Sequence, residues 1–188
     1  MAVEVELKAR IDDIDPVKER LSAIGSRHRS HHKSDTYWFS PLCPTLRVRR
    51  EQGLDADGAV YGSVVVTLKT KTISGGIEVN DEREFTVSDA GLFEELLDGL
   101  GMRVAIRKEK TGWAWDIPSP ATQLPPILAE LSMVTGLGWF LELEIVCPDH
   151  SGQLIEESRK RLLALLEQLE IPASRIESRT YSEMLTAL

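Results

Sequence analysis

EVELKAR, residues 4–10, alternates charged and apolar side chains. Successive side chains of an extended strand point to opposite faces, so the charged residues share one face and the apolar residues share the other. A strand with one face in water shows this pattern, and so does a strand whose charged face lines an interior. The pattern of charges in the other strands of the chain must decide between a solvent-facing strand and a strand that lines an interior.

The composition is that of an ordinary globular protein. A chain of 188 residues with 42% hydrophobic and 28% charged residues is expected to form one domain over residues 1–188. Its net charge of −8 argues against nucleic-acid binding, which needs surplus Lys and Arg. Without a membrane-length apolar run or a leader pattern, no membrane partner and a cytoplasmic location are expected. Cys43 and Cys147 lack metal-ligand spacing and are interpreted as reduced thiols.

Strands are expected to dominate, with helices between them. Asp15 as N-cap, Pro16 and Gly25 frame a first short helix, and Ser88 or Asp89 caps a second. Helical spacing predicts two more helices, a long one over 151–169 and a short one at 180–188. Strands are predicted by β-branched and aromatic runs at 4–10, 34–40, 44–51, 60–72, 76–89, 104–110, 128–134 and 139–147.

Charge is sorted between these strands. Glu-x-Glu occurs in the first and last of them, whereas Arg-x-Arg and Lys-x-Lys occur in strands between. The paired charges are Arg47 and Arg49, Lys69 and Lys71, Glu82 and Glu84, Lys108 and Lys110, and Glu142 and Glu144. An α+β sandwich with one solvated face would tolerate the pattern, but a solvated face usually mixes its charges. We therefore favour a closed antiparallel barrel with its charged faces inward and helices packed outside.

An interior lined by both carboxylates and cations is expected to bind a cation and an anion. Unpaired buried charges are costly, but Mg²⁺ or Mn²⁺ suits a group of carboxylates, and a linear triphosphate suits a row of Arg and Lys. Glu4 and Glu6 are accordingly interpreted as metal ligands and Lys8 as a phosphate contact.

An ordered set of motifs supports this interpretation. Glu4-x-Glu6-x-Lys8 is followed by DTYWF, LRVRR, TLK, EREF, RKEK, GLGWFLELE and YSEML. The set resembles the CYTH superfamily, the triphosphate tunnel metalloenzymes, which include class IV adenylyl cyclases and thiamine triphosphatases. The DTYWF and YSEML segments look most like the cyclase branch.

The resemblance implies a fold and a set of site residues. The fold is an α+β, eight-stranded antiparallel tunnel with helices outside. The implied metal ligands are Glu4, Glu6, Glu84, Glu142 and Glu144, and the implied triphosphate ligands are Lys8, Arg47, Arg49, Lys69, Lys108 and Lys110. Lys69 and Tyr37 are the expected catalytic residues.

The chain departs from the family pattern in two places. Lys108-x-Lys110 replaces Lys-x-Arg, and Lys lacks the bidentate fork of Arg. LSMV, with Ser132, replaces an acidic LDEV-like stretch, so a metal ligand is lost unless Glu130 supplies the charge.

Three other features have structural interpretations. Val104 and Ile106 share the parity of Lys108, which a bulge or the strand's exit from the barrel would explain. His28, His31 and His32 are expected on an exposed strand edge. Trp113, Trp115 and Trp139 are expected to pack on the outer face of the barrel.

The expected activity is that of a class IV adenylyl cyclase, which converts ATP to cyclic AMP and pyrophosphate with Mg²⁺ or Mn²⁺. Two alternatives remain: hydrolysis of an inorganic or organic triphosphate, such as tripolyphosphate, thiamine triphosphate or a nucleotide, and triphosphate binding without catalysis. No Ser-His-Asp or Cys-His pattern indicates covalent catalysis, so charge stabilisation would lower the barrier. The expected partner is a nucleotide or other triphosphate, and a homodimer is possible.

Overall fold

The computed structural model describes residues 3–41, 43–74, 77–119, 125–149 and 151–187. Within this part, the side chains of Arg27 and of residues 43–45, 69–74 and 81–82 lie outside the description.

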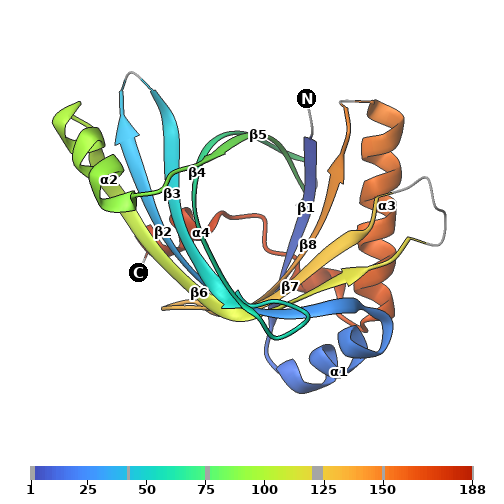
Figure 1. Cartoon of the computed structure of the whole chain (residues 1–188). Helices are drawn as coiled ribbons and strands as arrows, with labels where there is room; N and C mark the ends of the chain where they lie inside the picture. The colour runs from blue at the N-terminus through green and yellow to red at the C-terminus, as the bar shows by residue number, and fades with distance from the viewer. Residues whose placement is uncertain (1–2, 42, 75–76, 120–124, 150, 188) are drawn as a thin grey trace.

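A strongly curled antiparallel sheet forms the body of the molecule (Figure 1). Among the described residues its strands are β1 (Val3–Ile11), β2 (Ser26–Ser40), β3 (Cys43–Leu54), β4 (Val60–Ser74), β5 (Ile77–Thr86), β6 (Arg103–Ile117), β7 (Ile127–Val134) and β8 (Gly138–Cys147). They pair in the closed order β1-β5-β4-β3-β2-β6-β7-β8, and β8 returns to β1. The predicted α+β class, with a curled antiparallel sheet, is confirmed.

The helices are α1 (Ile14–Ile24), α2 (Ala90–Gly99), α3 (Gly152–Gln168) and α4 (Tyr181–Thr186), with the 3₁₀ turn η1 (Ala173–Arg175). The expectation that helices pack outside the barrel is wrong for α4, because Tyr181 of α4 lies against Lys8 and Lys108 of the inner face. In Figure 1, α3 stands along β1 and β8, and α2 lies at the opposite end of the molecule. In the part of the chain that is described, no helix is both long and apolar enough to span a membrane.

The ends of the predicted elements needed three corrections. The N-cap of α1 is Asp13, not Asp15, because the Asp13 carboxylate accepts the Asp15 N–H, and Pro16 lies one turn inside. β2 begins at Ser26, well before residue 34, and β6 continues to Ile117, well beyond residue 110. The β2 extension is polar and has little β-propensity, so cross-strand pairing holds it extended. The β6 extension contains β-favouring Trp113, Trp115 and Ile117, but Gly112 interrupts its signal.

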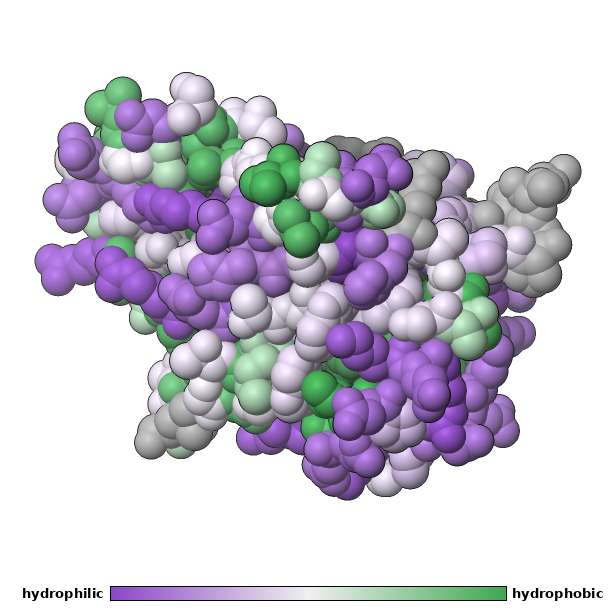
Figure 2. All heavy atoms as spheres, turned by 60° about the horizontal axis from the view of Figure 1, so that its bottom comes forward, coloured by the Kyte–Doolittle hydropathy of each residue, from purple (hydrophilic) through white to green (hydrophobic). Residues whose placement is uncertain are grey.

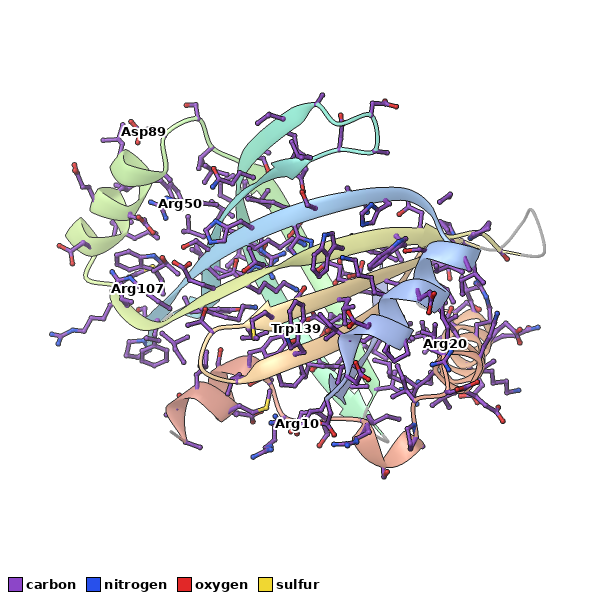
Figure 3. All side chains as sticks on the ribbon, turned by 90° about the horizontal axis from the view of Figure 1, so that it is seen from below. Arg10, Arg20, Arg50, Asp89, Arg107 and Trp139 are labelled. Carbon is purple, nitrogen blue, oxygen red and sulfur yellow. The ribbon has the colours of Figure 1, made fainter. Side chains whose placement is uncertain are left out.

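The two faces of the sheet differ as the alternation predicts. Val3, Val5 and Leu7 of β1 belong to a buried apolar cluster beneath α1 and α3. Trp115 lies in the same cluster, and Trp113 and Trp139 pack against it, stacked with 5.9 Å between their ring centroids. The outer position expected for the tryptophans is therefore confirmed, and Figure 3 shows Trp139 on this face.

A bulge explains the parity of Val104, whereas Ile106 does lie on the inner face with Lys108. Tyr37 pairs with Ile106, but Trp38 pairs with Val104, so β6 carries one extra residue, Ala105, at this point. One inserted residue shifts the alternation of side chains by one position, so the residues of β6 before the bulge point to the opposite face from the one that the alternation after it predicts. Lys108 and Ile106 therefore line the inner face, and Val104 leaves it.

Candidate functional site

The inner face of the sheet encloses two neighbouring cavities, of about 390 and about 200 Å³. Glu6, Arg47, Arg49 and Glu142 line both of them, so the two spaces adjoin. Further residues of the larger cavity are Lys8, Tyr37, Thr67, Glu78, Ala105, Ile106, Lys108, Thr180, Tyr181, Ser182 and Thr186. Further residues of the smaller cavity are Glu4, Lys33, Glu84, Lys110, Leu128, Glu130 and Glu144.

Asp35 joins two of the cavity cations. Its carboxylate accepts two hydrogen bonds from Arg49, at 2.7 and 3.0 Å, and lies 3.0 Å from Lys108 Nζ. Its side chain is fully buried. Burial alone would raise the pKa of Asp35, but Lys108 and Arg49 hold it well below its usual value. Asp35 is therefore ionised at neutral pH and fixes the positions of both cations.

A second ion-pair network lies beside the smaller cavity. Glu130 accepts from Lys110 at 2.9 Å and also from Lys33, and Lys110 donates to Glu142. Burial would raise the pKa of Glu142, but the charge and hydrogen bond of Lys110, together with the charge of Lys108, lower it to about 2. Glu130 is thus an inner-face carboxylate held between two lysines.

Lys8 and Arg47 also have acidic neighbours. Lys8 Nζ lies 3.7 Å from Glu78, and Arg47 donates to Glu84 at 3.2 Å. Thr67 donates its hydroxyl to the same Glu84 oxygen at 2.6 Å. The acid of β5 that meets Lys8 is therefore Glu78, which the sequence interpretation did not include.

Carboxylates concentrate around the smaller cavity. Glu4, Glu6 and Glu144 enter it from β1 and β8, and Glu6 pairs directly with Glu144 across those strands. Beside them Asn80 pairs with Glu4, is fully buried, and has no hydrogen-bond partner for either amide atom among the side chains that the structure describes. The oxygen-rich donor set and the orphaned amide fit a hard divalent cation. Among the described side chains, however, no group of three His, Cys, Asp or Glu residues is placed to hold a metal ion. The Glu142 carboxylate already accepts a hydrogen bond from Lys110.

Helix α4 supplies part of the wall of the larger cavity. Thr180, which caps the helix in a reciprocal capping box with Glu183, lines the cavity together with Tyr181. Lys8 and Lys108 lie over the Tyr181 ring, 4.7 and 4.8 Å from its centroid. Burial raises the pKa of Tyr181 well above its usual value, so its hydroxyl stays protonated.

The expectation for the histidines was wrong at His31, which is buried on the inner face. Its Nε2 lies 2.9 Å from the Ser132 hydroxyl, although β6 separates the two strands. Gly112 stands between the two residues in register, and its missing side chain leaves room for this contact. A Cβ at Gly112 would lie 2.0 Å from the Leu131 carbonyl oxygen. Burial lowers the pKa of His31 to about 3, so the ring is neutral.

Most residues named from the sequence line these adjoining cavities. They are Glu4, Glu6, Lys8, Tyr37, Arg47, Arg49, Glu84, Lys108, Lys110, Glu142 and Glu144. The side chains of Lys69, Lys71 and Glu82 lie outside the described residues. Sequence reasoning missed Lys33, Asp35, Glu78 and Asn80. Asp35 lies within the predicted strand 34–40 and alternates with Tyr37, so this alternation could have indicated it. Lys33 lies before that strand, in a stretch with no apolar alternation.

Comparison with known proteins gives concordant results. The CYTH domain model matches residues 2–181. A protein of Methanocaldococcus jannaschii named putative adenylate cyclase is 26% identical over 193 residues, covering 97% of this chain and 98% of its own. Among solved structures, a protein of Pyrococcus horikoshii OT3 has a TM-score of 0.80 at 25% identity, covering 98% of both chains.

A more distant solved structure shares the fold. It is a putative adenylyl cyclase of Hippeastrum, described as having a dominant triphosphatase activity. Its TM-score is 0.58 at 14% identity, covering 99% of this chain and 94% of that chain.

Proposed function

Because the chain belongs to the CYTH domain family, we propose that it is a divalent-metal-dependent, class IV adenylyl cyclase-like enzyme that converts ATP to cyclic AMP and pyrophosphate. The observation that carries this proposal is the shared wall of the two cavities, where Arg47 and Arg49 meet Glu6 and Glu142. One side of this wall offers cations for phosphates, and the other offers carboxylates for a metal. The full-length relative named putative adenylate cyclase supports the cyclase assignment.

The triphosphate would bind to cations that are already positioned inside a closed eight-stranded tunnel. Arg49 and Lys108 are held by Asp35, so neither has to be ordered when the ligand arrives. Charge-assisted hydrogen bonds from Arg fit phosphate oxygens in a fixed geometry. Lys8 on β1 and Lys110 on β6 add further cations, and Lys69 of β4 is proposed to join them.

Glu4, Glu6, Glu84, Glu142 and Glu144 would hold Mg²⁺ or Mn²⁺, with Glu130 as a further carboxylate of the same cavity. When bound, the metal supplies positive charge that orients the phosphates and stabilises the transition state. If Glu142 is to bind the metal, the hydrogen bond from Lys110 to its carboxylate must break. Lys110 would then turn towards a phosphate.

In the cyclase reaction the ribose 3′-oxygen bonds to the α-phosphorus while the bond from that phosphorus to pyrophosphate breaks. The attacking hydroxyl loses one proton. Tyr37 and Lys69 are the proposed catalytic residues for this step. Burial would raise the pKa of Tyr37, but the positive charges of Lys108, Arg47 and Arg49 together outweigh burial and lower it. The phenolate of Tyr37 therefore forms more readily than usual and would accept the proton of the attacking hydroxyl.

A triphosphatase is the second candidate, because the same cations and carboxylates would serve attack by water on a terminal phosphorus. The Hippeastrum protein, whose fold is shared, is described as having such an activity. A third candidate is triphosphate binding without turnover. It is favoured because Glu130 and Glu142 are both in ion pairs with Lys110, which competes with a metal for these carboxylates.

One experiment separates these functions. Purified protein is incubated with ATP or with tripolyphosphate, in the presence of Mg²⁺ or Mn²⁺, and the products are analysed. Cyclic AMP with equal pyrophosphate identifies a cyclase, and orthophosphate identifies a triphosphatase. Thermal stabilisation without products identifies a binding protein. Absence of both products and stabilisation would contradict the proposed triphosphate site.

A further inference from the structure

Asn80 lies where an asparagine is unfavourable. It is the only asparagine of the chain, and it lies within strand β5, although asparagine is depleted in strands. Hydrophilic residues cover much of the face that Figure 2 shows, and solvent hydrates an amide in such a place. Asn80 is instead 0% exposed. A residue that suits neither its strand nor its burial is expected at a functional site.

The side chain of Asn80 points to the inner face of the sheet. Ile77 and Val79 pack in the apolar cluster outside, so Glu78 and Asn80 alternate to the other face. Glu78 lines the larger cavity, and Asn80 pairs directly with Glu4, which lines the smaller one. Directly paired residues lie side by side on one face of a sheet. The amide therefore lies at the wall of the smaller cavity, beside Glu4.

This amide has unused hydrogen-bonding capacity. Among the groups that the structure describes, neither Oδ1 nor Nδ2 of Asn80 has a hydrogen-bond partner. A fully buried polar group without a partner requires an explanation, such as a bound ion. A hard divalent cation binds oxygen at about 2.0 to 2.6 Å, closer than the oxygen of a hydrogen-bonded water at about 2.8 Å. A wall too close for water can therefore still admit a cation.

We propose that Asn80 Oδ1 is a ligand of the divalent cation, next to the Glu4 carboxylate. This inference rests on the proposed function, in which the smaller cavity holds the metal. Hard cations accept amide oxygens as well as carboxylates. Among the described side chains, the acidic residues alone form no group of three that is placed to hold a metal, so a neutral oxygen supplies a ligand that the carboxylates lack.

The neutrality of the amide matters for the triphosphate. Six carboxylates and four cations line the smaller cavity among the described side chains. A seventh carboxylate would attract a metal more strongly, but it would also repel the negative charges of the triphosphate. An amide adds an oxygen ligand without adding charge. Asn80 is therefore expected to increase metal affinity without weakening triphosphate binding.

Mn²⁺ binding by the full chain, without any substrate, tests the proposal. The electron paramagnetic resonance signal of free Mn²⁺ falls as the ion binds to the protein, so a titration gives the affinity. Asn80→Leu keeps the size of the side chain and removes both polar atoms, and should weaken Mn²⁺ binding at least about tenfold. Its melting temperature in EDTA should not fall, because no buried amide is left without a partner. Gln52→Leu makes the same change at an exposed amide of β3 and should bind Mn²⁺ like the wild type.

Asn80→Asp tests the role of charge. It should bind Mn²⁺ at least as tightly as the wild type, because it adds a charged oxygen beside Glu4. At saturating Mn²⁺ it should bind tripolyphosphate about fivefold more weakly or worse, measured by isothermal titration calorimetry. A purely structural role of the amide would not change the two affinities in opposite directions.

Two results would overturn the inference. They are wild-type Mn²⁺ affinity in Asn80→Leu, and a lower melting temperature of this variant in EDTA, which would make the amide a structural group. If Asn80→Leu does not fold, Asn80→Asp decides, and a loss of Mn²⁺ affinity in that variant would contradict the proposal. Glu4→Gln separates this failure from that of the proposed function. Weaker Mn²⁺ binding in Glu4→Gln but not in Asn80→Leu refutes the role of Asn80 alone, whereas wild-type binding in both refutes the metal site itself.

Discussion

Asp35 and Arg49 form a bidentate ion pair, with 2.7 and 3.0 Å contacts, inside the ring of strands. A comparable pair on the outside, Arg50 with Glu94, links β3 to α2 (Figure 3 shows Arg50). Burial distinguishes the two: the Asp35 side chain is fully buried, whereas the Arg50 side chain is 40% exposed.

We therefore expect Asp35→Asn to reduce the free energy of unfolding by about 3 to 5 kcal/mol, because it leaves Arg49 and Lys108 without their buried counter-charge. Glu94→Gln, in the outer pair whose arginine reaches solvent, should cost about 1 kcal/mol. Urea denaturation of both variants gives the comparison. Equal losses would mean that the interior of the sheet is as well solvated as its surface.

Glu4→Gln and Glu6→Gln should each lower turnover at least about 100-fold with little change in melting temperature, because each removes a proposed metal-ligand charge. Product formation is measured across a Mn²⁺ titration. Glu167→Gln, on the exposed side of α3, is the control. Wild-type activity in both β1 variants would refute the interpretation of EVELKAR as a metal-binding strand.

Arg47→Ala and Arg49→Ala should weaken tripolyphosphate binding by about tenfold or more, because each removes a charge-assisted contact to phosphate. Arg20→Ala, on α1 and outside the cavities, should have little effect. Isothermal titration calorimetry measures the three affinities. Similar losses at all three positions would argue for unspecific charge attraction rather than a shaped site.

The structure favours Glu130 over Ser132 as the residue that replaces the missing acid of the family pattern. Glu130 lines the smaller cavity, whereas the Ser132 hydroxyl lies against His31. Glu130→Gln should therefore lower activity and destabilise the fold by about 3 kcal/mol, since Lys33 and Lys110 lose their shared partner. Ser132→Asp should not lower the Mn²⁺ concentration for half-maximal activity. A lower requirement in Ser132→Asp would restore the family assignment of that position.

His31 makes stability sensitive to mild acid. The unfolded ring titrates near its ordinary pKa of 6.5, whereas the buried ring titrates at about 3, so the unfolded chain binds an extra proton between these values. Stability should therefore fall as the pH drops, by about 2 kcal/mol between pH 6.5 and 5. His31→Gln should have a shallower dependence in this window, measured by urea denaturation at several pH values. An unchanged slope would place the proton uptake elsewhere, for example at His28, whose pKa burial also lowers.

The alternation in β1, β3 and β8 was enough to predict the inner face of the sheet, because the charged residues named there, such as Glu6, Arg47 and Glu142, stand next to buried apolar ones. It was insufficient at β2, where Ser30, His32 and Ser34 on the outer face are polar too. With no apolar alternation, the inward direction of His31 and Lys33 depends on pairing with β3 and β6. Such long-range pairing is not encoded locally, and neither is the extra residue of β6.

The pairing of Glu130 with two lysines was also beyond prediction. Sequence indicates which residues share a face, but the choice of ion-pair partner depends on strand register across β2, β6 and β7. Asn80 gives no sequence signal at all, since a lone Asn in a strand resembles an ordinary surface residue.

The return of β8 to β1 has a consequence for how the chain folds during synthesis. β1 pairs with β8 along its whole length, from Val3 with Cys147 to Ile11 with Trp139. During synthesis, the edge of β1 that pairs with β8 therefore stays open until β8, the last of the described strands, is made. Contacts between such distant segments form slowly, and an open edge can recruit strands of other nascent chains. Translation rate and chaperone access over Gly138–Cys147 should thus control the yield of native protein.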